Sequence, residues 1–274
     1  MTSENRMMAN IGKLANFLDE SGNRIEYKGN IDKHVNIIFH GRNNRIVVHK
    51  NANFNFLDIE FFGNEGQIEI GENLGVTPLK AFLKVGSESK IVIGNSVSNS
   101  MVSTIVATEG CSIVIGSDVM LSSDAYISTG DEFPVYDVES GLRVNPAKSI
   151  RIGNHVWLAR RSTVSGGANI GDGSVIGFGS LVDGVLPNNC IAAGIPARII
   201  KKNIAWERIH LSLKEPFYKP DASAIQKSPY WAPTVVDSTA STFLGYEVDE
   251  IKIFSRTKLF IVNIWKRASS RFWK

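Results

Sequence analysis

The most suggestive candidates for proton transfer in this sequence stand close to aromatic or charged neighbours. His155 lies two residues before Trp157, and Asp131 and Glu132 are adjacent in a charged stretch. Histidine is the usual general acid or base near neutral pH, and a carboxylate takes that role when burial raises its pKa. The alternative for all three groups is an ordinary structural role, as a surface histidine and as loop carboxylates that are solvated or form salt bridges.

The other histidines and the cysteines do not form a metal site. Three histidines fall at unrelated positions early in the chain, and the two cysteines have no CxxC spacing: His34, His40, His49, Cys111 and Cys190. Zinc and disulfide frameworks need closely spaced ligands or several cysteine pairs. We therefore predict no metal, and the cysteine content indicates a reducing, cytoplasmic compartment.

A short strand pattern recurs along the first part of the chain. Each copy is apolar–x–apolar, usually followed by glycine, and the last residue of each copy stands at 27, 48, 70, 93, 115 and 152. The intervals are 21, 22, 23, 22 and 37 residues. Alternation of this kind buries every second side chain of a strand. Even spacing indicates one such strand per repeat, stacked on its neighbours.

Further along the chain the period shortens to six. Large aliphatic residues recur in phase at Ile152, Leu158, Val164, Ile170, Ile176 and Val182, and a mostly small residue follows each at the fifth position of its sextet. Three sextets make one turn of a triangular parallel β-helix, with aliphatic residues inside and small residues at tight corners. A glycine-rich β-sandwich is the alternative, but it does not require six aliphatic residues in phase.

The long interval between 115 and 152 contains a charged stretch, 132–148, with Pro134, Gly141 and Pro146. One coil with a protruding loop over about 129–148 explains this interval better than two full coils. Long loops on a rigid scaffold commonly carry function.

The sextets, Val156-Trp157, the stretch 177–180 (GFGS) and the stretch 194–198 (GIPAR) resemble the hexapeptide-repeat acyltransferases. More narrowly, the sequence resembles bacterial capsule, exopolysaccharide and lipopolysaccharide O-acetyltransferases, most specifically from about 124 to 202. This resemblance implies an all-β fold, a left-handed parallel β-helix, although the general crossover rule would predict a right-handed one. It also implies a homotrimer with active sites between adjacent subunits.

The resemblance further implies acetyl transfer from acetyl-CoA to a sugar hydroxyl. Such a reaction needs a general base, donors for the oxyanion and groups that hold the cofactor phosphates. The family places its base, a histidine, in the protruding loop, where this sequence has Phe133. Phenylalanine cannot accept a proton. Either His155, Asp131 or Glu132 is the base, or the protein is a catalytically degenerate subunit.

The same resemblance implies that five positions contact the cofactor. Trp157 would lie beside the thioester, and Ala159 and Phe178 would border the cofactor groove. Arg198 and Lys201 follow the end of the coil and would contact the phosphates of coenzyme A. The two basic residues are also compatible with a solvated surface.

The two ends of the chain lack the repeat. Apolar residues at 8, 11, 14, 15 and 18 have helical spacing, so residues 1–21 are expected to form an N-terminal capping helix. The β-helix would occupy 22–202, and 203–274 would form a C-terminal arm and a basic amphipathic segment. Segment 1–20 lacks the apolar run of a signal peptide.

Charge is concentrated at the C-terminal end. Residues 252–274 hold seven basic and no acidic residues, so the rest of the chain carries a net charge of −4, because the whole chain has +3. Segment 251–274 would form a helix that either contacts an anionic membrane surface or packs on the trimer. The small net charge gives no reason to expect nucleic acid, and the 43% hydrophobic and 21% charged composition excludes a disordered chain.

We therefore predict an acetyl-CoA-dependent O-acetyltransferase of a surface polysaccharide or its sugar precursor. It would be cytoplasmic, with peripheral contact at the inner membrane through 251–274. An N-acetyltransferase of a nucleotide-linked amino sugar and a catalytically degenerate β-helix subunit are the alternatives.

Overall fold

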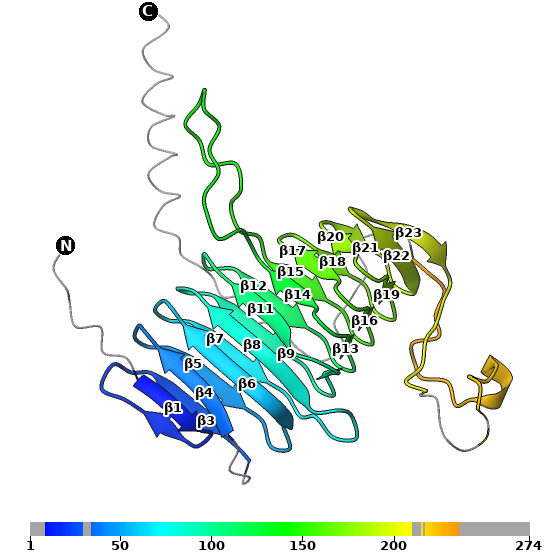
Figure 1. The fold of residues 1–274 in the computed structure, drawn as a ribbon, viewed down its shortest axis with the longest axis horizontal. Coiled ribbons are helices and arrows are strands. Elements are labelled where there is room, and N and C mark those ends of the chain that lie inside the picture. Colours follow the sequence, from blue (N-terminus) through cyan, green and yellow to red (C-terminus); the bar gives the residue numbers. More distant parts are fainter. Residues whose placement is uncertain (1–8, 30–33, 210–214, 216, 236–274) are drawn as a thin grey trace, which may run out of the picture. The chain divides into compact units, whose positions relative to one another are not determined.

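The computed structural model describes residues 9–29, 34–209, 215 and 217–235. This part of the chain forms a parallel β-helix whose coils build three sheets, A, B and C (Figure 1). The basic segment 251–274 lies outside the described residues. Within them, no helix is long and apolar enough to cross a membrane.

Sheets A and B run the whole length of the coil. Sheet A has eight strands, in spatial order β1 (Ala9–Lys13), β4 (His34–Phe39), β6 (Phe54–Phe61), β8 (Leu79–Val85), β11 (Ser103–Ala107), β14 (Tyr126–Ser128), β17 (Thr163–Ser165) and β20 (Leu181–Val182). Sheet B has nine: β2 (Phe17–Leu18), β3 (Arg24–Tyr27), β5 (Arg45–Val48), β7 (Gln67–Ile70), β9 (Lys90–Ile93), β12 (Ser112–Ile115), β15 (Ile150–Ile152), β18 (Asn169–Ile170) and β21 (Val185–Leu186).

Sheet C begins only in the second half of the coil. Its six strands are β10 (Ser98–Asn99), β13 (Met120–Leu121), β16 (Trp157–Leu158), β19 (Val175–Ile176), β22 (Cys190–Gly194) and β23 (Ala197–Lys202). The early coils thus have two long strands each, whereas the later coils have three short ones. This change explains why the sequence period shortens.

The predicted strands align in register. Ile25, Ile46, Ile68, Ile91 and Ile113 pair in succession along sheet B, and the series continues into β15. The six in-phase aliphatic residues of the sextets are all buried, and so are the small residues at the fifth positions. Ile152 pairs with Ile170, so one coil is three sextets long, as predicted.

Glycine follows the sheet B strands β7, β9, β12, β15 and β18, and the next coil leaves no room for a side chain there. A Cβ atom on Gly94 would lie 2.7 Å from the carbonyl group of Gly116, and one on Gly116 would lie 2.7 Å from that of Gly153. In five successive coils, a left-handed corner lies three residues after the sheet B strand, with φ of 57°, 60°, 51°, 69° and 50° at Ser96, Asp118, His155, Gly173 and Asn189. Glycine, asparagine, aspartate and histidine tolerate this conformation better than most residues. Asp118 and His155 are therefore equivalent corner residues of adjacent coils.

The N-terminal capping helix is wrong for the described residues. Residues 9–18 form β1 and β2, which pair antiparallel with β4 and β3. The open edges of sheets A and B offer unpaired N–H and C=O groups, and pairing with them outweighs the local helical spacing. Leu14 is buried between the two strands, and the ring of Phe17 stacks on Phe39 at 6.1 Å.

Two segments leave the coil. A loop over 129–149 joins β14 to β15 and protrudes as a narrow hairpin (Figure 1). Ile113 pairs directly with Ile150, so the long interval is one coil with an excursion, as predicted. After the antiparallel strand β23, the described residues 203–209 and 217–235 form an arm, whose only regular element there is a short 3-10 helix, η1 (Ala222–Ala224).

Candidate active site

Asn145 organises the base of the loop. Its side-chain oxygen accepts a hydrogen bond from the backbone N–H of Val135 at 2.7 Å. Its side-chain nitrogen donates to Asp131 Oδ2 and to the carbonyl oxygen of Phe133, both at 2.9 Å. This single amide therefore fixes three positions of the strand that should carry the base, and it holds Asp131 in a structural contact.

An ion pair ties the loop to the coil. Arg143 Nη1 lies 2.6 Å from Glu109 Oε1, and the other oxygen of Glu109 accepts the backbone N–H of Ala147 at 3.1 Å. The hydrogen bond from Ala147, followed by that from Arg143, lowers the pKa of the Glu109 carboxyl. Both contacts hold the returning strand of the loop, and Asn145 of that strand holds the outgoing one.

Glu132, unlike Asp131 and Glu109, has no such structural contact. It is exposed, and it makes no hydrogen bond or ion pair with the described residues. Two grooves meet at it. One, of about 580 Å³, crosses sheet A between the loop base and Tyr126, Thr163 and Leu181; the other, of about 630 Å³, lies on the opposite side of the loop base beside Lys84.

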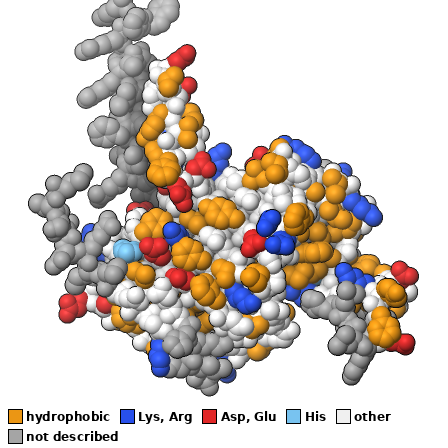
Figure 2. Space-filling view, in the orientation of Figure 1, with side chains coloured by type: hydrophobic (Ala, Val, Ile, Leu, Met, Phe, Trp, Pro, Cys, Tyr) orange, Lys and Arg blue, Asp and Glu red, His pale blue; other side chains and the backbone are white. Residues whose placement is uncertain are grey.

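Phe133 projects from the same place, with 76% of its surface exposed. Other apolar side chains along the loop are also exposed, and they form an orange band on the protruding hairpin in Figure 2: Val135, Tyr136, Val138, Leu142 and Val144. Exposed apolar groups in such number usually mark an interaction surface.

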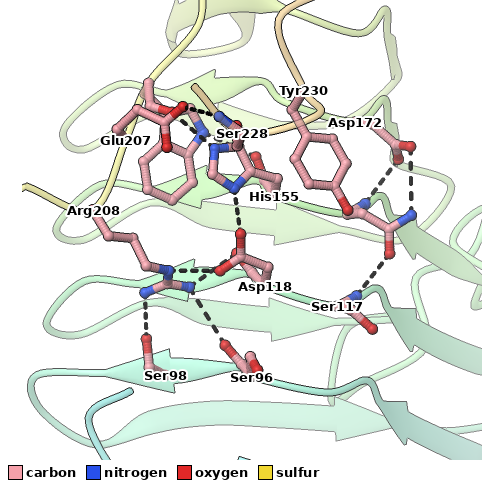
Figure 3. Close-up of polar contacts among 12 residues, drawn as sticks. Ser96, Ser98, Ser117, Asp118, His155, Asp172, Glu207, Arg208, Ser228 and Tyr230 are labelled. Carbon is pink, nitrogen blue, oxygen red and sulfur yellow. Dashed lines mark hydrogen bonds and ion pairs between the residues drawn. The ribbon is translucent and has the colours of Figure 1, made fainter. Parts of the chain in front are cut away.

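The structure buries His155, so the prediction of a solvated surface histidine is wrong. The side chain is 2% exposed, and the rings of Trp206 and Tyr230 stack on it at 4.1 Å and 4.6 Å (Figure 3). Its Nε2 donates to the carbonyl oxygen of Trp206 at 2.8 Å, and its Nδ1 lies 2.5 Å from Asp118 Oδ2. Both ring nitrogens face acceptors, so the ring has no free nitrogen with which to take a proton from a substrate.

Asp118 joins His155 to the arm. Its other oxygen accepts Arg208 Nε at 2.6 Å, and Arg208 also donates to Ser98 Oγ at 2.8 Å (Figure 3). Burial alone would raise the pKa of the Asp118 carboxyl, but the hydrogen bonds from His155 and Arg208 outweigh it, so the pKa lies below its ordinary value. Asp118, His155, Trp206, Arg208 and Tyr230 form a single network, called here the arm clasp.

The five positions assigned to the cofactor lie at or near one corner of the coil, where sheet C meets sheet A. Trp157 is partly exposed in β16, and its Nε1 donates to Ser122 Oγ at 3.0 Å. Ala159 and Phe178 stand at the corners of adjacent coils, whose backbones are joined by the bond from Gly179 N to Arg160 O. Phe178 is 66% exposed.

Arg198 continues this row on β23, where its Nη1 lies 3.7 Å from Asp183 Oδ1, and Lys201 is exposed on the same strand. Ala159 and Phe178 precede the sheet A strands β17 and β20, whereas the loop base follows the end of β14. The groove across sheet A is lined by both predicted loop carboxylates, Asp131 and Glu132, and by Thr163 and Leu181, but by none of the five predicted cofactor positions.

Sequence reasoning missed Asn145, Asp118 and the aromatic residues of the arm. A signal existed for Asp118, because it follows Gly116 by two residues just as His155 follows Gly153. No local signal identifies Trp206 and Tyr230 as partners of His155, because both lie far beyond it in the chain.

No family model matches the sequence. The chain is 34% identical over 173 residues to the polysialic acid O-acetyltransferase of Neisseria meningitidis, a match that covers 61% of this chain and 77% of that protein. The chain belongs to the hexapeptide-repeat acyltransferase family.

Two further comparisons agree with this assignment. The chain is 34% identical over 120 residues to the polysialic acid O-acetyltransferase of Escherichia coli O1:K1 / APEC, but the match spans only 39% of that protein. The crystal structure of the polySia specific acetyltransferase NeuO superposes with a TM-score of 0.56 and 27% identity, over 70% of this chain and 92% of that one. The predicted left-handed parallel β-helix of this family is confirmed as the fold.

Proposed function

We propose that this protein transfers an acetyl group from acetyl-CoA to a hydroxyl of a surface polysaccharide or of its sugar precursor. The observation that carries the proposal is the groove across sheet A, which runs from the loop base as far as Thr163 and Leu181. These are the first residues of β17 and β20, the strands that follow the corner positions Ala159 and Phe178. Membership of an acyltransferase family that includes proteins named polysialic acid O-acetyltransferase supports it. Arg198 and Lys201 supply positive charge for the phosphates at the end of the row.

In this reaction the acceptor oxygen attacks the thioester carbon, a C–O bond forms and the C–S bond breaks. The hydroxyl proton must go to a base, and it then passes to the departing thiolate of coenzyme A. We propose that Glu132 is this base. His155 has both nitrogens engaged, and Asp131 is held by Asn145, whereas Glu132 borders the groove and has no partner among the described residues.

A thiol-release assay with acetyl-CoA and a panel of oligosaccharides tests the activity. We expect coenzyme A release that depends on the glycan, and a product that gains one acetyl group by mass spectrometry. An ester is cleaved by mild alkali, whereas an amide from an amino sugar is not, so alkali treatment separates O-acetylation from N-acetylation. Absence of both release and acetyl-CoA binding would contradict the proposal and favour a degenerate subunit.

The variant Glu132→Gln tests the base. We expect kcat to fall by about 10²-fold or more, with an unchanged dissociation constant for acetyl-CoA, because the amide cannot take a proton. Glu139→Gln is the matched control, since it removes an exposed carboxylate elsewhere on the same loop and should leave kcat unchanged. Wild-type kcat in Glu132→Gln would remove Glu132 from the mechanism.

We further propose a homotrimer. The exposed apolar side chains of the loop need a covering surface, and a neighbouring copy would supply it. Analytical ultracentrifugation should give a mass about three times the chain mass of 30.1 kDa. Replacing Val138 and Leu142 with serine should shift this mass toward the monomer, and an unchanged mass would argue against the loop as the contact.

A cytoplasmic location, with peripheral contact at the inner membrane, is also part of the proposal, because acetyl-CoA is an intracellular donor. Segment 251–274, which lies outside the described residues, carries the basic and apolar residues for that contact. Sedimentation with vesicles that contain anionic lipid tests it. Equal binding to neutral vesicles, or none to either, would contradict the membrane contact.

A further inference from the structure

A cavity of about 400 Å³ lies between sheet C and the arm. Met120 and Trp157 of the sheet line it on one side, and Trp206, Glu207, Ile225 and Trp231 of the arm line it on the other. It contains three of the five tryptophans of the chain. No residue of the loop lines this cavity, and Trp157 is the one position among those assigned to the cofactor that does.

The walls of this cavity are fixed by hydrogen bonds. Trp231 Nε1 donates to Glu207 Oε1 at 2.7 Å, and the backbone N–H of Ser228 donates to the same oxygen at 2.8 Å. Trp206 is held from behind by the arm clasp, through its stack on His155 and the bond from its Nε1 to the carbonyl oxygen of His155 at 2.9 Å. The indole rings are therefore oriented before any ligand arrives, which reduces the ordering cost of binding.

The lining combines flat aromatic surfaces with charged groups at the rim. The N–H groups of Trp157 and Trp231 are already used, so what these residues offer a ligand is the surface of their rings. Trp231 is 38% exposed, and Lys227 Nζ lies 4.6 Å from its ring centroid. Lys219 at the rim is exposed and has no carboxylate partner among the described residues.

We propose that this cavity is a subsite for one pyranose ring of the acceptor glycan, an inference that rests on the proposed function. The C–H face of a pyranose packs against an indole ring, while its hydroxyl or carboxylate groups need donors at the edge, here Lys219. An acyl chain would pack against the indole rings but would leave the Lys219 ammonium group at the rim without a partner. Because Trp157 is shared with the cofactor row, a ring held here is part of a chain that continues toward the transferring acetyl group.

The experiment measures the affinity of the purified full chain for two probes, a hexamer of α2,8-linked sialic acid and a neutral hexamer of β1,4-linked N-acetylglucosamine. Binding is followed by tryptophan fluorescence and by calorimetry, and the two hexamers distinguish an acidic from a neutral ring. We expect at least one of them to bind, with an affinity that falls about tenfold in Trp231→Ala. Trp231→Phe keeps a ring but loses the bond to Glu207, so it should retain most of the affinity.

A second variant distinguishes loss of the subsite from undocking of the arm. Ala222 borders the cavity on η1, and Ala222→Trp should fill the cavity and weaken glycan binding without removing any contact of the arm. Tyr218→Ala, at an exposed side chain outside the cavity lining, is the matched control and should bind like wild type. Hydrogen exchange at Ile204 and Ser228 reports whether the arm stays docked in each variant.

The results separate this inference from the proposed function. Unchanged glycan affinity in Trp231→Ala and Ala222→Trp would overturn the subsite even if the protein acetylates a glycan. A larger dissociation constant for acetyl-CoA in these variants would also overturn it, because the cavity would then bind the acetyl donor. Tighter binding of a fatty acyl probe than of either hexamer would overturn the choice of a sugar.

Discussion

Replacing His155 with alanine separates the arm clasp from catalysis. The substitution removes two hydrogen bonds, one to the Asp118 carboxylate and one to the Trp206 carbonyl oxygen, and it removes two ring stacks. Bonds that involve a charged group contribute about 1.5–3 kcal/mol each, and aromatic pairs about 0.5–1.5 kcal/mol each. Contacts in one network are not additive, so we expect the docking of the arm to weaken by about 3–5 kcal/mol.

That loss corresponds to an increase of at least about two orders of magnitude in the opening equilibrium of the arm. Hydrogen exchange measures it directly. The amides of Ile204, Ser228 and Thr234 bond across the arm or to the coil, and they should lose protection. Amides of the inner coils, such as Ile113 in β12, should not change, because the coil does not depend on the arm for its own pairing.

His40→Ala is the matched control, because His40 pairs with Glu60 at 3.0 Å on the surface and its loss should cost less than about 1 kcal/mol. The reasoning would be refuted by one pattern in particular. If His155→Ala left the exchange of the arm amides unchanged but lowered kcat by about 10²-fold or more, His155 would be a catalytic base after all.

Three other predictions concern the loop, the coil and the pH dependence of the arm. Phe133→His should raise kcat by less than about tenfold if Glu132 is the base, and a gain of about 10²-fold or more in turnover assays would contradict that assignment. Gly116→Ala should lower the free energy of unfolding by about 1–3 kcal/mol in denaturant titration, because its Cβ would lie 2.7 Å from the carbonyl group of Gly153; Gly184→Ala, with open space around it, should be neutral. Because the pKa of Asp118 is lowered in the folded protein, its ionised carboxylate stabilises the docked arm at pH values above the ordinary carboxyl pKa. This stabilisation is lost as the pH falls through the pKa that Asp118 has in the folded protein. The protection factors of arm amides, taken relative to intrinsic exchange at the same pH, should therefore fall below about pH 4, and Asp118→Asn should lack this acid dependence.

The coil was predictable because it repeats. Each aliphatic residue of the sextets supports the same strand position as its neighbours, so local pattern and tertiary packing agree. The N-terminal segment was not predictable in this way, since its apolar spacing fits a helix as well as two short strands. The free edges of β4 and β3 decided between them, and no window of local sequence contains that information.

The residues of the candidate site also differ in whether the local sequence predicts their position. Phe133 and the loop carboxylates could be placed from the sequence, because the loop interrupts a regular period. The burial of His155 could not, because the ring is covered by Trp206 and Tyr230, which follow it by 51 and 75 positions. A corner residue of a solenoid points outward by construction, and only a later segment that folds back can bury it.

The antiparallel strands at the two ends have a consequence for evolution and design. Because β1 and β2 run against their neighbours at the first edges of sheets A and B, and β23 does so at the last edge of sheet C, these three edges do not continue the parallel register to which another molecule could add. Growth from within stays permitted, because an inserted unit of three sextets would add one strand to each sheet and restore the register. Lineages could thus lengthen the platform in increments of about 4.8 Å, one inter-strand spacing at a time, without disturbing either end.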